Sequence, residues 1–211
     1  MEFGVDEAGK GPVLGSMFVA AVRADPAALP DGVGDSKGIA PARRRELDEV
    51  IREAAEAVAV VEISVERIDD PDTDMNELTV DGHGEALSRV VEAGLSGYAD
   101  AGDTNAVRFE RRVADRLDPA VDLRAEHGAD ESYPIVGAAS ILAKVARERH
   151  VEELAAAYGP VGSGYPSDPT TRDFLESFVA EEGELPACAR ESWQTSRDVL
   201  SARDQASLSD F

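Results

Sequence analysis

Cysteine, lysine and long apolar runs are what this sequence has least of. The single cysteine, Cys188, excludes an internal disulfide. No apolar stretch approaches the roughly 18 residues that a membrane-spanning helix needs, and the first residues lack a basic segment followed by an apolar one. We therefore expect a cytoplasmic protein with no membrane partner.

Positive charge is also scarce, with 21 Lys and Arg against 43 Asp and Glu, a net charge of −22. This sign opposes non-specific attraction to nucleic acid and to anionic membranes. Because the acids are spread over every segment instead of forming one tail, they favour adaptation to a cytoplasm of high salt, where the Debye length falls to about 3 Å at 1 M.

Only three lysines remain, Lys10, Lys37 and Lys144, and all lie among glycine, serine or other small residues. If composition has removed lysine from the general surface, these three mark positions where a compact ammonium is needed. Chance placement is the alternative.

The most informative stretch is residues 3–12, where Asp6 and Glu7 lead into a turn containing Gly9, Lys10 and Gly11. Short apolar runs on both sides, the second at residues 13–22, predict a strand, a tight turn and a second strand. Glycines let a backbone approach a ligand closely, and paired acids bind divalent metals. The stretch therefore suggests phosphodiester chemistry, with an ordinary hairpin and solvated acids as the alternative.

Strands alternate with helices along the rest of the chain, which indicates an α/β sheet with a helical C-terminal third. A length of 211 residues suits one such domain with at most a small appendage. We expect later strands at 58–65, from 96 and at 121–126, and helices at 42–56, 76–93, 106–117, 135–158, 170–182 and 189–203.

Four carboxylates stand at or just beyond expected strand ends: Asp6, Glu7, Asp103 and Asp130. Ligands of open α/β sheets collect outside the C-terminal strand ends, so these side chains can converge. Oxygen ligands without paired His or Cys suit Mg²⁺ or Mn²⁺ and argue against zinc. Each acid alone is weak support in so acidic a chain.

The three histidines carry less information. We expect His83 to lie in a glycine-flanked turn and His150 on an exposed helix face, both solvated. His127, three residues before Asp130, could either shuttle a proton or cap a strand.

Six short motifs stand out along the chain: residues 6–12 (DEAGKGP), 35–37 (DSK), 101–103 (AGD), 127–130 (HGAD), 138–144 (AASILAK) and 163–168 (SGYPSD). Taken together, these motifs resemble ribonuclease HII, the type 2 ribonuclease H family, in its archaeal form. The resemblance implies an RNase H-like mixed sheet flanked by helices, with a catalytic domain over 1–160 and a C-terminal helical segment over 161–204 packed on it.

The resemblance also implies an endoribonuclease, a monomer, that hydrolyses the RNA strand of RNA–DNA hybrids. It would cleave 5′ of single ribonucleotides in duplex DNA and leave 3′-OH and 5′-phosphate ends. The family's metal ligands map onto Asp6, Glu7, Asp103 and Asp130. A non-catalytic protein associated with a sliding clamp, or another RNase H-like nuclease, remains the alternative.

Substrate contacts follow from the same resemblance. The glycine turn and a tyrosine would sense the 2′-hydroxyl at a ribose–deoxyribose junction, and further residues would hold phosphates. These residues are Gly9, Lys10, Gly11, Tyr165, Ser36, Lys37, Ser140, Lys144 and Arg147. The chain departs from the family at three positions, with Lys10 where arginine is usual, Gly128 where lysine is common and Gly137 where serine is common.

The last residues, 205–211, match a peptide that docks on sliding clamps of the PCNA type. Gln205, Leu208 and Phe211 have its spacing, with Leu208 and Phe211 filling an apolar pocket. A frayed helix end is the alternative.

Overall fold

The computed structural model describes residues 1–34 and 38–209, and side chains as far as 205. None of the helices within those residues is long and apolar enough to cross a membrane. The elements in chain order are β1 (Glu2–Ala8), β2 (Met17–Ala24), the 3₁₀ helix η1 (Pro26–Ala28), α1 (Pro41–Ala54), β3 (Ala57–Ile63), α2 (Val65–Ile68), α3 (Met75–Ser88), β4 (Ser96–Asp100), α4 (Ala106–Ala114), β5 (Asp122–Glu126), α5 (Ala129–Ser132), α6 (Pro134–Tyr158), α7 (Pro169–Glu182) and α8 (Gln194–Ser209).

The chain forms two compact units. Unit 1 comprises residues 1–8, 17–63 and 74–147, and unit 2 comprises 9–16, 64–73 and 148–211. Helix α6 changes unit after Arg147, before the position 160 expected from the sequence. The reason is that Val151 and Leu154 of its last turns pack on the apolar core of unit 2.

Unit 1 is built on a five-stranded sheet with the order β3-β2-β1-β4-β5. Strand β1 runs antiparallel to β2 and parallel to β4, so the expected mixed α/β sheet is confirmed. Ala8 pairs with Phe18, and β2 begins at Met17. The expectation of a strand from residue 13 was wrong, because residues 13–16 belong to unit 2.

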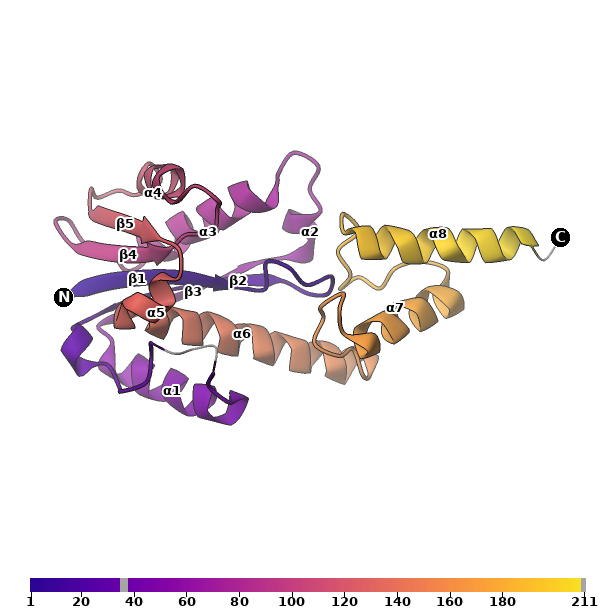
Figure 1. Cartoon of the computed structure of the whole chain (residues 1–211), viewed down its shortest axis with the longest axis horizontal. Coiled ribbons are helices and arrows are strands. Elements are labelled where there is room, and N and C mark those ends of the chain that lie inside the picture. Colours follow the sequence, from indigo (N-terminus) through magenta and orange to yellow (C-terminus); the bar gives the residue numbers. More distant parts are fainter. Residues whose placement is uncertain (35–37, 210–211) are drawn as a thin grey trace. The chain divides into compact units, whose positions relative to one another are not determined.

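Helices cover both faces of this sheet, α1 and α6 on one and α3 and α4 on the other (Figure 1). Leu47 and Ile51 of α1 join Ala20 and Val22 of β2 in one buried cluster with the first turns of α6. A Cβ on Gly4 would lie 2.5 Å from the carbonyl oxygen of Ile135. Helix α6 therefore approaches β1 closely.

Helix α3 corrects the expected turn around His83. Its N-cap is Asp74, whose Oδ1 accepts hydrogen bonds from the amides of Asn76 and Glu77. The helix then continues to Ser88 through Gly82 and Gly84, and His83 is fully buried. The histidine expected to be solvated is thus a core residue.

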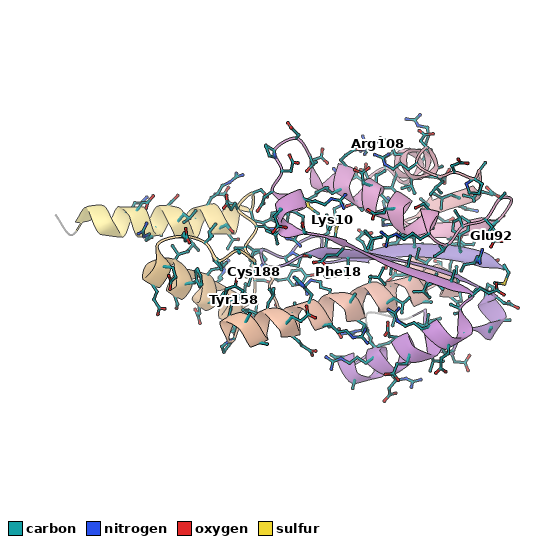
Figure 2. All side chains as sticks on the ribbon, turned by 180° about the vertical axis from the view of Figure 1, so that it is seen from behind. Lys10, Phe18, Glu92, Arg108, Tyr158 and Cys188 are labelled. Carbon is teal, nitrogen blue, oxygen red and sulfur yellow. The ribbon has the colours of Figure 1, made fainter. Side chains whose placement is uncertain are left out.

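Unit 2 gathers segments that are distant in the sequence. Val13 and Leu14 share an apolar core with Val161, Leu175 and Cys188. The amides of Val13 and Leu14 donate to the carbonyl of Gly164, at 2.8 and 3.2 Å. Residues 9–16 are thereby fixed to the 161–168 loop; Figure 2 shows the surrounding side chains, with Lys10, Tyr158 and Cys188 labelled.

Candidate active site

The C-terminal ends of β1 and β4 bring two carboxylates together. Val5 pairs with Ala99 in the parallel register, so the residues that follow, Asp6 and Asp100, lie at neighbouring positions. The side chain of Asp6 is on the α6 face and only 5% exposed. Strand pairing alone therefore creates an acidic pair at this edge.

Both carboxyls have raised pKa values. Burial raises the pKa of Asp6 well above its usual range, and the charges of Glu7 and then Asp100 add to the effect. Burial also raises the pKa of Asp100, to which the charges of Glu7 and Asp130 contribute. The negative charges of these carboxylates therefore act on one another's pKa, as expected at a site that binds a divalent cation.

Asp130 joins the cluster through the short helix α5. The amide of Ala129 donates to Asp100 Oδ1 at 2.9 Å, which ties the end of β4 to the start of α5. Gly128 precedes this helix with a φ of 69°, a conformation that glycine adopts without strain.

Glu7 faces the opposite side of the sheet, toward α3. Its Oε2 lies 2.9 Å from Nε2 of His83, and its Oε1 lies 3.0 Å from the position of a Cβ on Gly102. Since a carboxylate only accepts, Nε2 donates this hydrogen bond. Sequence reasoning missed this partner, because His83 is 76 residues away from Glu7.

Asp103, which the sequence predicted as a metal ligand, pairs instead with an arginine. Its carboxylate forms a forked ion pair with Arg108, with Nη2 2.6 Å from Oδ2 and Nε 3.2 Å from Oδ2. The hydrogen bonds from Arg108 lower the pKa of Asp103. Strand β4 ends at Asp100, three residues earlier, and it is Asp100 that interacts with Asp6 and Asp130.

Two of the expected substrate-binding residues lie beside this cluster on α6. Ser140 hydrogen-bonds the carboxylate of Asp6, and Nζ of Lys144 donates to Ser140 Oγ at 2.8 Å. The same Nζ is 3.9 Å from Asp130 Oδ2. Arg147 follows on the same helix, at the end of unit 1.

The glycine turn and Tyr165 are brought together in unit 2. Tyr165 Cε1 lies 3.7 Å from the position of a Cβ on Gly11, and its side chain is 41% exposed. Gly9 has a φ of 93°, which a side chain would oppose. His150, expected to be solvated, accepts a hydrogen bond from the amide of Ser16 at 3.2 Å and so supports the end of this turn.

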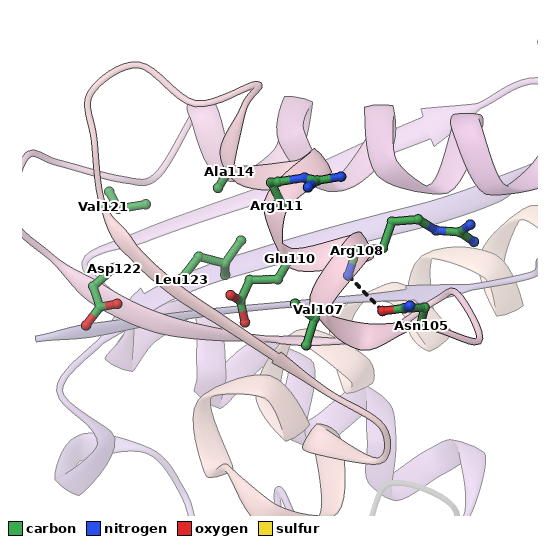
Figure 3. Close-up of a pocket in the computed structure, with 9 residues that line it drawn as sticks. All are labelled: Asn105, Val107, Arg108, Glu110, Arg111, Ala114, Val121, Asp122 and Leu123. Carbon is green, nitrogen blue, oxygen red and sulfur yellow. Dashed lines mark hydrogen bonds between the residues drawn. The ribbon is translucent and has the colours of Figure 1, made fainter.

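A pocket of about 840 Å³ lies elsewhere, between α4 and β5 (Figure 3). Arg108 and Arg111 line it together with Glu110 and Asp122. None of the clustered carboxylates contributes to it, so this pocket is not the site.

The donor set of the cluster fits a hard divalent cation, because all its candidate ligands are carboxylate oxygens that repel one another. Within the described residues, no three Asp, Glu, His or Cys side chains already converge closely enough to hold an ion. Alternation along β1 directs the side chain of Asp6 toward α6 and that of Glu7 toward α3.

Several expected positions lie beyond what the structure describes. Ser36, Lys37 and Phe211 fall outside the described residues, and Leu208 is described only by its backbone, as part of α8. Gln205 is exposed on the same helix.

Comparisons with known proteins agree with the resemblance. A family model described as Ribonuclease HII matches residues 3–196. A ribonuclease HII of Haloarcula marismortui is 69% identical over 211 residues, which cover 100% of both chains. The ribonuclease H2 of Pyrococcus horikoshii superposes with a TM-score of 0.90 at 35% identity, over 96% of this chain and 98% of that one.

A second solved structure, of the PCNA:RNase HII complex from Archaeoglobus fulgidus, superposes with a TM-score of 0.86 at 39% identity, over 94% of this chain and 96% of that one. The match of the family model to most of the sequence, and of a relative to all of it, leads to one conclusion: the chain belongs to the ribonuclease HII family of divalent-metal-dependent endoribonucleases.

Proposed function

We propose that the chain hydrolyses the RNA strand of RNA–DNA hybrids and cleaves 5′ of single ribonucleotides in duplex DNA, leaving 3′-OH and 5′-phosphate ends. The observation that carries this proposal is the placement of carboxylates at the neighbouring ends of β1 and β4 and on α5, which the Ala129 amide ties to Asp100. The proposed metal ligands are Asp6, Glu7, Asp100 and Asp130, with Asp100 in place of Asp103.

Mg²⁺ or Mn²⁺ bound there would supply the Lewis-acid chemistry of phosphodiester hydrolysis. The protein's own groups hold the substrate. Lys144, kept beside the cluster by Ser140, provides a cation for a backbone phosphate. The turn at Gly9, Lys10 and Gly11 contacts the ribose 2′-hydroxyl, and the ring of Tyr165 packs on the adjacent deoxyribose. Ser36, Lys37 and Arg147 add phosphate contacts.

The test is cleavage of three labelled duplexes, one with a single ribonucleotide, one an RNA–DNA hybrid and one all DNA, in high salt with Mg²⁺ or Mn²⁺. We expect cleavage of the first two and not of the third, loss of cleavage in EDTA, and recovery when the metal is restored. Binding to the duplexes without cleavage under any metal condition would favour the non-catalytic alternative.

We also propose that residues 205–211 bind a PCNA-type sliding clamp. The structure of the PCNA:RNase HII complex from Archaeoglobus fulgidus supports this for a related chain. Calorimetry of the full chain with the clamp tests it, with Leu208→Ala and Phe211→Ala as variants. Unchanged affinity of both variants would exclude this peptide as the clamp contact.

A further inference from the structure

A fully buried arginine lies behind the glycine turn of unit 2. Arg190, between α7 and α8, is 0% exposed. Its guanidinium donates to three backbone carbonyls of one turn, with Nη2 2.7 Å from Gly9 O, Nη1 3.1 Å from Lys10 O and Nε 2.8 Å from Gly15 O. Burying a guanidinium is costly unless its donors are satisfied, so the turn and Arg190 require each other.

Trp193 completes the arrangement. Its indole Nε1 donates to Gly11 O at 3.2 Å, and the guanidinium of Arg190 lies 4.7 Å above its ring. The main chain of Arg190 is itself anchored, because its amide donates to Val13 O at 2.9 Å. The carbonyls of Gly9, Lys10 and Gly11 are therefore all held by two side chains.

The direction of these carbonyls sets the direction of the amides. In a planar trans peptide the N–H points opposite to the C=O, so holding Gly9 O and Lys10 O toward Arg190 turns the amides of Lys10 and Gly11 away from it. The third carbonyl, of Gly11, precedes Pro12, which has no N–H. Gly11 is exposed and adjoins Tyr165.

We propose that Arg190 is a positioning residue for ribonucleotide recognition, which aims the Lys10 and Gly11 amides at the 2′-hydroxyl and the adjoining phosphate of the substrate. The proposal rests on the proposed function, in which this turn contacts the ribonucleotide. If Arg190 had a purely structural role, replacing it would lower the stability of the protein and leave the KM for ribonucleotide-containing duplexes unchanged. If it is a positioning residue, replacing it raises that KM with little change in kcat.

The experiment measures KM and kcat on the single-ribonucleotide duplex for Arg190→Lys, together with the melting temperature. Lysine keeps the charge but is a compact ammonium that cannot match three separated carbonyls. We expect Arg190→Lys to lose at least one charge-assisted hydrogen bond to these carbonyls. The expected result is a rise in KM of about tenfold or more, with kcat within about threefold of the wild-type value. Arg197→Lys, at an exposed position of α8, is the matched control and keeps the wild-type KM.

If Arg190→Lys does not fold, Trp193→Phe is the second variant, since it keeps a ring under the guanidinium and removes only the donor to Gly11 O. We expect a smaller rise in its KM at wild-type kcat. Folded variants with unchanged KM, or a fall in melting temperature and kcat alone, overturn the inference and leave the proposed function standing. Failure of the wild type to cleave any ribonucleotide-containing duplex overturns both.

Discussion

Nε2 of His83 on α3 donates a hydrogen bond to Oε2 of Glu7 on β1, at 2.9 Å. The imidazole is fully buried and meets the ring of Phe109 edge-on, with 5.0 Å between centroids and 85° between planes. Packing therefore fixes the histidine, and the histidine fixes one oxygen of a proposed metal ligand. Partners of this kind orient ligands and tune their affinity for the metal.

Replacing His83 by Phe should weaken Mn²⁺ binding about 10- to 100-fold, because Glu7 loses the donor that orients it. His83→Gln is the matched control, since its amide can still donate to Glu7, and it should retain most of the affinity. Calorimetric titration with Mn²⁺ measures both, and melting in EDTA reports on folding. Wild-type affinity in folded His83→Phe would show that Glu7 needs no such partner.

Asp100→Asn and Asp103→Asn should differ in how much they slow cleavage. Asp100→Asn removes a carboxylate that interacts with Glu7 and Asp130, so we expect cleavage of a single-ribonucleotide duplex to fall by more than about 100-fold. Asp103→Asn disrupts an ion pair with the half-exposed Arg108 and should cost less than about tenfold. A larger loss of cleavage in Asp103→Asn than in Asp100→Asn would indicate that Asp103, and not Asp100, is the metal ligand.

This pair also marks the limit of the sequence as a guide to the site. The alternation of strands and helices predicted the fold correctly, and Asp6, Glu7 and Asp130 were identified as candidates with Ser140 and Lys144 beside them. Asp100 is the last residue of β4 and Asp103 lies three residues beyond it, however, and only the pairing of Val5 with Ala99 shows which one adjoins Asp6. Register is a property of two strands together, which one strand's pattern does not contain.

His83 was missed for a related reason. Glycines on both sides predicted a turn, but Gly82 and Gly84 are there because a Cβ would lie 2.7 Å from Val19 Cγ2 at the first and 2.8 Å from Arg116 Cβ at the second. Glycine can mark close packing within a helix as well as a turn, and the neighbours that decide between the two are distant in the sequence.

Gly137 on α6 should tolerate no side chain. A Cβ there would overlap the carbonyl oxygen of Val33. Gly137→Ala should lower the free energy of unfolding by about 1–3 kcal/mol. Gly34→Ala, whose Cβ would have only the Glu131 carbonyl oxygen at 3.8 Å, is the control. Equal denaturation midpoints for the two variants would contradict the packing described for α6.

Asp168 should make the stability depend on pH in the acid range. The amide of Ser163 donates to its Oδ2 at 2.7 Å, and this contact, followed by those from Thr170 and Thr171, lowers the pKa of Asp168. The folded state therefore binds this proton more weakly than the unfolded one. The stabilisation is present above the unfolded pKa of about 3.9 and is lost as pH falls through the lower folded value.

Asp168→Asn should accordingly unfold more easily than the wild type at pH 7, with the difference shrinking below about pH 4. Chemical denaturation at several pH values measures this. A stability difference between variant and wild type that stays constant, or grows toward acid pH, would mean that the charge of Asp168 does not stabilise the loop.

The net charge of −22 should make salt stabilising. Like charges distributed over the surface repel one another at low ionic strength, and the Debye length shrinks from about 10 Å at 0.1 M to about 3 Å at 1 M. We expect the melting temperature and the rate of cleavage to rise with KCl to a high optimum, against the usual weakening of phosphate contacts by salt.

A charge-reduced variant separates screening from other effects of salt. Glu49, Glu53, Glu152 and Glu153 are exposed, the first two on α1 and the others on α6. Changing all four to Gln removes repulsion without touching the carboxylate cluster, so its melting temperature should rise less steeply with KCl than that of the wild type. An activity maximum below about 0.1 M salt, or an identical slope in the variant, would show that surface repulsion does not set the salt response.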